Sequence, residues 1–139
     1  MDISRRDTLA LGAGAVALTV LPLHASAAGV DEMINTFTGG AAVADGGVDL
    51  DAPEIAENGN TVPISVSAEG ASAILVMAAG NPTPDVAEFK FGPLAGSSSA
   101  STRIRLAGTQ DVIAIAKLAD GSFGKAQKTV KVTIGGCGG

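Results

Sequence analysis

Apolar residues alternate with polar ones in four short stretches, and two further stretches are apolar throughout. Alternation with period two is typical of a strand with one buried face, and a short continuous apolar run is typical of a fully buried strand. Together they predict strands over residues 61–68, 73–79, 86–91, 101–106, 112–119 and 126–134. Turn-forming Gly, Asn, Pro and Asp residues separate them. Pro63, which lacks an N–H, suggests that the first strand is a sheet edge.

One stretch before the strands has helical spacing instead, with Val30, Met33, Ile34 and Phe37 on one face. It predicts a short helix over residues 29–38, ended by Gly39 and Gly40. The whole pattern predicts an all-β fold, an immunoglobulin-like antiparallel β-sandwich with a short N-terminal helix. With one cysteine, the chain cannot have the disulfide of immunoglobulin domains.

Composition limits the size of the fold and the class of partner. The 139 residues, 46% hydrophobic and 17% charged, suit a single packed domain whose core is mostly aliphatic, because Trp and Tyr are absent. A net charge of −5 argues against nucleic-acid binding. Lys125, Lys128 and Lys131 form a small basic run, which is either a solvated strand face or a docking patch for a partner.

Residues 1–27 have the features of an export signal. The pair Arg5–Arg6 precedes an uncharged stretch from Leu9 to Leu21, and the small residues of 25–27 suit a cleavage site. This segment resembles a bacterial twin-arginine (Tat) signal, although an ordinary secretory signal is the alternative. In either case we expect a mature chain that begins near Ala28 and lies in the periplasm.

The chain ends in Gly-Gly-Cys-Gly-Gly, with Cys137 between Gly135, Gly136, Gly138 and Gly139. Glycine has no side chain to pack and loses much entropy on ordering, so this segment is expected to be a flexible arm. The last strand is expected to hold the chain up to Ile134, and the five residues beyond it can reach roughly 17 Å. The expected division is thus 1–27 signal, 28–134 β-sandwich and 135–139 arm.

Cys137 has no partner within its own chain. The only histidine, His24, lies in the leader, so neither a metal site nor a Cys–His catalytic pair is expected. An isolated thiol has a pKa of about 8.5 and is only slightly ionised at neutral pH. Such a thiol becomes useful when the active site of another protein receives it, which is the logic of a carrier. A chance terminal cysteine, an intermolecular disulfide and a metal ligand stay open as other roles.

Four segments resemble the SoxY family of sulfur-oxidation carrier proteins: Glu54–Ile64, Gly80–Phe89, Ser101–Phe123 and the tail VKVTIGGCGG. The resemblance implies an immunoglobulin-like sandwich that pairs with a smaller subunit, SoxZ. It implies that Cys137 is the covalent attachment point for sulfur intermediates of thiosulfate oxidation, and that the chain is not itself an enzyme and has no cofactor. It also implies transient partners: the haem enzyme SoxXA, the hydrolase SoxB and the molybdenum–haem enzyme SoxCD.

Two rival functions follow from the same tail. An exported structural sandwich could dimerise through a disulfide between two copies of Cys137. A ubiquitin-like sulfur carrier could use the terminal Gly138–Gly139 as a thiocarboxylate, but that chemistry needs cytoplasmic ATP-dependent activation, and the export signal argues against it.

Overall fold

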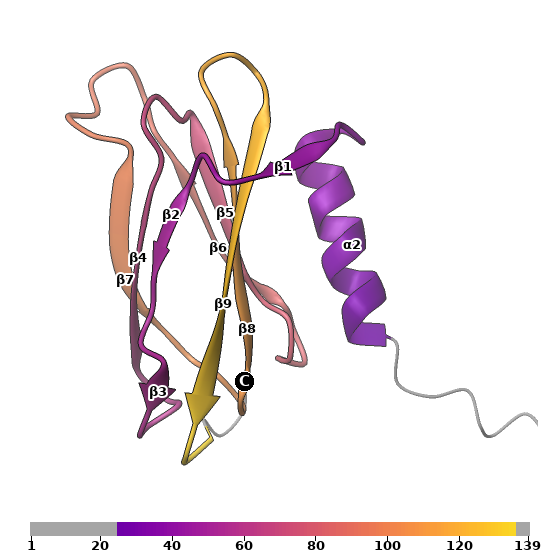
Figure 1. Ribbon diagram of the computed structural model, residues 1–139, viewed down its shortest axis with the longest axis vertical. Helices are drawn as coiled ribbons and strands as arrows, with labels where there is room; N and C mark the ends of the chain where they lie inside the picture. Colours follow the sequence, from indigo (N-terminus) through magenta and orange to yellow (C-terminus); the bar gives the residue numbers. More distant parts are fainter. Residues whose placement is uncertain (1–24, 136–139) are drawn as a thin grey trace, which may run out of the picture.

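The computed structural model describes residues 25–135, and the remaining residues at both ends lie outside it. Its elements are α2 (Ala25–Thr38), β1 (Val43–Asp45), β2 (Asp49–Asp51), β3 (Ile55–Ala56), β4 (Val62–Ser67), β5 (Ala73–Ala78), β6 (Asp85–Lys90), β7 (Ser99–Ile104), β8 (Gln110–Lys117) and β9 (Phe123–Val132). Figure 1 shows two sheets face to face, with α2 alongside the larger one. The predicted β-sandwich with a short N-terminal helix is therefore confirmed.

The larger sheet has the order β1-β9-β8-β5-β6, with β3 also pairing with β9, and the smaller sheet has the order β2-β4-β7. The long pairings are antiparallel, as predicted. Only the short β1 and β3 run parallel to β9. Strand β9, which leads to the chain end, therefore has hydrogen-bonded partners on both sides: β8 on one side, and β1 and β3 on the other.

The main core lies between the two sheets. Val62, Ile64 and Val66 of β4 point inward and are almost fully buried, whereas Pro63 is exposed, as the alternation predicts. Side chains of β5, β8 and β9 fill the opposite side of this core. Burial of these aliphatic side chains supplies the main stabilisation of the sandwich.

The outer face of the larger sheet is covered by α2. Val30, Met33, Ile34 and Phe37 of the helix belong to a second apolar cluster with side chains of β5, β8 and β9. Strands β5 and β8 are thus buried on both faces, which explains why their sequences are continuous apolar runs.

Replacing Phe37 by alanine should loosen the helix from the sheet. The Phe37 ring meets Phe123 edge to face, with centroids 5.8 Å apart. Loss of this pair and of its burial should lower the free energy of unfolding by about 2 kcal/mol. Urea unfolding of Phe37→Ala beside Thr36→Ala, the exposed neighbour, would measure this; equal stabilities would contradict the packing.

The turn between β8 and β9 contains Asp120 and Gly121, which are among the turn-forming residues that separate the predicted strands. Gly121 donates its N–H to the Leu118 carbonyl at 3.0 Å and has a φ of 83°, a conformation that favours glycine. The hydroxyl and the backbone N–H of Ser122 both donate to Asp120, and these bonds lower the pKa of the Asp120 carboxyl.

The structure corrects several predicted boundaries. The sequence pattern missed β1, β2 and β3, and β9 begins at Phe123 instead of residue 126. Strand β4 is the middle strand of its sheet and not an edge, but β2 pairs with it only as far as Ser65, so Pro63 still lies where one side of the strand has no partner. Helix α2 begins at Ala25, within the predicted leader.

Candidate functional site at the exit of the chain

The predicted attachment residue, Cys137, lies outside the described residues, as do Gly136, Gly138, Gly139 and the export-signal pair Arg5–Arg6. Of the predicted arm, the structure describes only Gly135. The site can therefore be built from its base, where the chain leaves the sandwich below the end of β9 (Figure 1).

Beyond β9 the chain is held by hydrogen bonds of its backbone and of the Thr133 hydroxyl, which donates to the Glu57 carbonyl at 3.0 Å. The Thr133 N–H donates to the Ala56 carbonyl at 3.0 Å, and the Gly59 N–H donates to the Ile134 carbonyl at 2.8 Å. The chain is thus held up to Ile134, as predicted, but β9 itself ends at Val132 and not at residue 134, and Ile134 is 68% exposed. The grip on the last described residues comes from hydrogen bonds to residues 54–59.

A second segment closes over the exit from the other side. The Leu106 N–H donates to the Gly59 carbonyl at 2.8 Å, so Gly59 links the tail to residues 105–109. The Ala107 carbonyl oxygen lies directly against Gly135, where a Cβ atom would overlap it. We call residues 54–59 and 105–109 the exit clasp.

Two buried amides hold the exit clasp in place. Asn81 accepts from the Ala107 N–H at 2.9 Å and donates to the Arg105 carbonyl at 2.8 Å. Gln110 donates to the Asn81 amide oxygen at 2.8 Å and accepts from the Gly80 N–H at 2.8 Å. Asn81 and Gln110 are only 6% and 8% exposed, so these bonds replace water that cannot reach the groups.

Replacing Asn81 by alanine should loosen the exit clasp. The change removes the acceptor of the Ala107 N–H and the donor to the Arg105 carbonyl, and leaves the Gln110 amide with its bond to the Gly108 carbonyl alone. Buried groups that lose a partner cost about 1–3 kcal/mol each. We expect the free energy of unfolding to fall by about 2–3 kcal/mol in a urea titration. Asn60→Ala, an exposed asparagine nearby, should stay within about 0.5 kcal/mol of the parent protein; an equal loss in both variants would contradict the role of Asn81.

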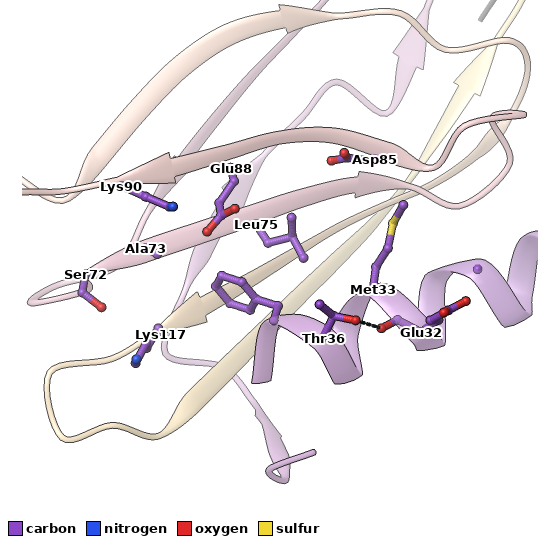
Figure 2. Close-up of a pocket in the computed structure, with 12 residues that line it drawn as sticks. Glu32, Met33, Thr36, Ser72, Ala73, Leu75, Asp85, Glu88, Lys90 and Lys117 are labelled. Carbon is purple, nitrogen blue, oxygen red and sulfur yellow. Dashed lines mark hydrogen bonds between the residues drawn. The ribbon is translucent and has the colours of Figure 1, made fainter. Parts of the chain in front are cut away.

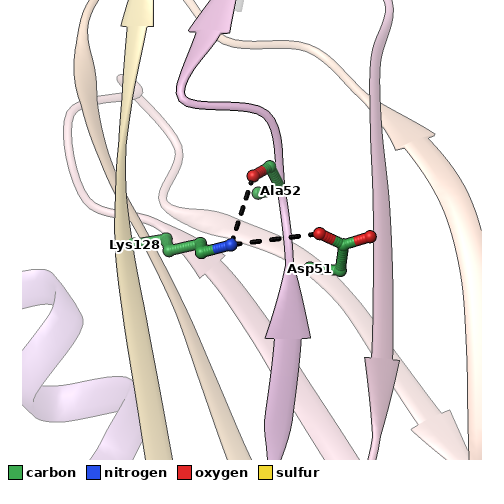
Figure 3. Close-up of polar contacts among 3 residues, drawn as sticks. All are labelled: Asp51, Ala52 and Lys128. Atoms are coloured by element: carbon green, nitrogen blue, oxygen red, sulfur yellow. Dashed lines mark hydrogen bonds and ion pairs between the residues drawn. The ribbon is translucent and has the colours of Figure 1, made fainter.

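The basic run does not form a single face. In β8–β9 pairing, Lys128 lies opposite Val112 of the inter-sheet core, whereas Lys125 lies opposite Ile115 on the helix side. Lys128 reaches towards β2, with its Nζ 3.9 Å from the Asp51 carboxylate and 3.4 Å from the Ala52 carbonyl (Figure 3). Because both partners are well exposed, this ion pair contributes little stability. Lys125 and Lys128 therefore lie on opposite faces of β9.

A groove of about 810 Å³ lies between α2 and the β5–β6 side of the larger sheet. Figure 2 shows Met33 of the helix and Leu75 of β5 among its lining side chains, with Glu88 and Lys90 on β6. None of its lining residues belongs to the exit clasp. Within residues 25–135, no cluster of metal-ligating side chains is found, and no helix has the length and apolar character to span a membrane.

The comparisons with known proteins agree with this architecture. The family model described as "Sulfur oxidation protein SoxY" matches residues 34–137 and thus ends on Cys137. The structure of the sulfur carrier protein SoxY from Chlorobium limicola f thiosulfatophilum is similar with a TM-score of 0.68 and 32% identity, over 78% of this chain and 99% of that one. A search of curated sequences gives no match. These matches and the fold thus define a β-sandwich protein of sulfur oxidation, and the chain belongs to the SoxY family.

More distant structures share only the fold. The superoxide reductase (neelaredoxin) from Ignicoccus hospitalis is similar with a TM-score of 0.55 and 17% identity, over 63% of this chain and 80% of that one. A variant of the Archaeoglobus fulgidus neelaredoxin gives a TM-score of 0.50 at 9% identity, over 60% of this chain and 86% of that one. At these identities the likeness supports an immunoglobulin-like sandwich and nothing about chemistry.

The four segments that carry the SoxY resemblance meet at the exit clasp. Gly59 comes from the first segment, Asn81 from the second, Ala107 from the third and Gly135 from the tail. The sequence shows the four segments only as marks of the family and does not predict that they contact one another. Their one local signal was the turn sequence Gly80-Asn81-Pro82, which predicts a turn but not where the Asn81 side chain points.

Proposed function

We propose that this protein is a periplasmic covalent carrier of sulfur intermediates in thiosulfate oxidation, and that Cys137 is the attachment point. The observation that carries the proposal is the family match, which runs through the sandwich and ends on Cys137. The similar Chlorobium protein is itself described as a sulfur carrier. The exit clasp adds physical support, because it contacts the chain as far as Gly135, two residues before Cys137 in the sequence.

The carrier chemistry needs only a thiol from this chain. In loading, the Cys137 thiolate and thiosulfate form an S–S bond and give up two electrons, which a haem enzyme of the SoxXA kind accepts. In release, water attacks the terminal sulfone sulfur in a hydrolase of the SoxB kind, so that sulfate and two protons leave and a persulfide stays on Cys137. An enzyme of the SoxCD kind then oxidises the remaining sulfane sulfur. The chain binds no cofactor of its own in this scheme.

Covalent attachment to a protein arm suits a series of reactions in which several enzymes act on the same sulfur. A covalent link stops the reactive persulfide from diffusing away, and it raises the local concentration of the sulfur at each docked enzyme. Glycines on both sides of Cys137 leave no Cβ to block a narrow channel.

The direct test is enzymatic loading. Purified mature protein is incubated with thiosulfate and the haem enzyme, then digested with trypsin, which should release residues 132–139 as one peptide. We expect this peptide to gain one S₂O₃ group in place of the thiol hydrogen, and to lose the group on reduction. An unmodified peptide after complete turnover of the haem enzyme would overturn the proposal.

The proposed assembly is a heterodimer with a SoxZ-like subunit, and the alternative is a homodimer linked through Cys137. Gel filtration of the reduced protein with and without the second subunit separates them. We expect a mixed complex that persists in reductant. A dimer of this chain alone that dissociates in reductant, with no sulfur adduct at any stage, would favour the structural alternative.

A further inference from the structure

We infer that Gly135 is a positioning residue: its contact with the Ala107 carbonyl fixes the direction in which the carrier arm leaves the sandwich. This inference rests on the proposed carrier function, and it gives the glycine nearest the sandwich a different role from the others. Flexibility alone would make the glycines before Cys137 interchangeable. The geometry of the exit clasp makes Gly135 distinct.

Position 135 has no room for a side chain. A Cβ atom on Gly135 would overlap the carbonyl oxygen of Ala107, which is backbone and not the end of a flexible side chain. Among the described glycines, only Gly124 has a comparable conflict with backbone, and it lies buried where β9 meets Gly46. Several loop glycines, such as Gly92 and Gly108, have nothing within 4 Å of that position. At Gly135 the absence of a side chain therefore permits a close approach.

The Ala107 carbonyl cannot readily move aside. The N–H of the same residue donates to Asn81, and the preceding N–H, that of Leu106, donates to the Gly59 carbonyl. Leu106 is fully buried in the inter-sheet core. On the opposite side, the Ile134 carbonyl is held by the Gly59 N–H. Any side chain at position 135 would have to displace the tail or break these bonds.

The distance that Cys137 can move away from Gly135 is short. Two residues span at most about 7 Å, so the thiol of Cys137 cannot move far from the point at which Gly135 releases the chain. The direction set at Gly135 then decides which volume the thiol can sample beside the body. A partner enzyme that docks on the body receives the thiol only if that volume includes its active site.

The experiment compares Gly135→Ala with Gly136→Ala in the full mature chain. Amide hydrogen exchange at Gly59, whose N–H donates to Ile134, reports on the clasp itself. We expect the Gly59 amide of Gly135→Ala to exchange about tenfold faster, and that of Gly136→Ala to be unchanged. Steady-state loading by the haem enzyme reports on positioning: KM for the carrier should rise about tenfold in Gly135→Ala, with kcat and the rate of iodoacetamide reaction at Cys137 unchanged.

Two results would overturn the inference. Equal exchange of the Gly59 amide in the two variants would make Gly135 an ordinary link of a flexible arm. Faster exchange at Gly59 with an unchanged KM would leave it a purely structural glycine. Cys137→Ser is the control for the underlying function: if that variant still supports turnover, the carrier proposal fails, whereas the exchange comparison still reports on the clasp.

Discussion

Replacing Cys137 by serine should abolish sulfur loading and thiosulfate-dependent turnover while the fold keeps its stability. A serine oxygen cannot form the S–S bond that holds the intermediate. The described contacts of the tail with the body come from residues 133–135, through backbone groups and the Thr133 hydroxyl, and Ile134 is largely exposed. We expect turnover at the level measured without carrier, and a free energy of unfolding within about 0.5 kcal/mol of the parent protein.

The control for this prediction is Ser101→Ala, which removes a hydroxyl from the exposed Ser65–Ser101 pair on the smaller sheet and leaves the thiol in place. It should load sulfur normally. A marked loss of stability in Cys137→Ser would show that the thiol packs against the body. Retained turnover in that variant would remove the attachment site from Cys137.

Replacing Leu106 by alanine should have the largest effect on stability. Leu106 is fully buried in the core between the sheets. It directly precedes Ala107, whose carbonyl lies against Gly135. Removal of a buried leucine side chain leaves a cavity and typically costs about 3–4 kcal/mol, which urea unfolding would measure.

Leu94→Ala is the matched control, because it removes the same atoms from a side chain that is 100% exposed in the loop before β7. It should change the free energy of unfolding by no more than about 0.5 kcal/mol. Similar losses in the two leucine variants would contradict the assignment of Leu106 to the core.

The longer strands could be predicted because each has a buried face that the sequence marks. Strand β4 alternates because only one of its faces is buried. Strands β5 and β8 are unbroken apolar runs because both of their faces are buried. The strands β1, β2 and β3 have only two or three residues each, too few for a period to show. Ile134 continues the alternation of β9 in the sequence, but the strand ends at Val132, and Ile134 is 68% exposed.

The candidate site was predictable only in its chemistry. Cys137 stands out because it is the single cysteine, set among glycines at the chain end. The exit clasp depends on contacts between distant positions, such as Asn81 with Ala107, 26 residues apart. No local pattern records such a contact, and a glycine at position 135 looks the same in sequence whether it serves flexibility or close approach.

The central claim is that sulfur travels on Cys137. Its most direct test is the intact mass of the native protein, purified without reductant from cells that are oxidising thiosulfate. We expect species heavier by sulfur atoms or by a thiosulfonate group that reductant removes, and a tryptic digest should place the addition within residues 132–139. A Cys137 that is found only as a free thiol or as a disulfide between two copies of this chain would contradict it.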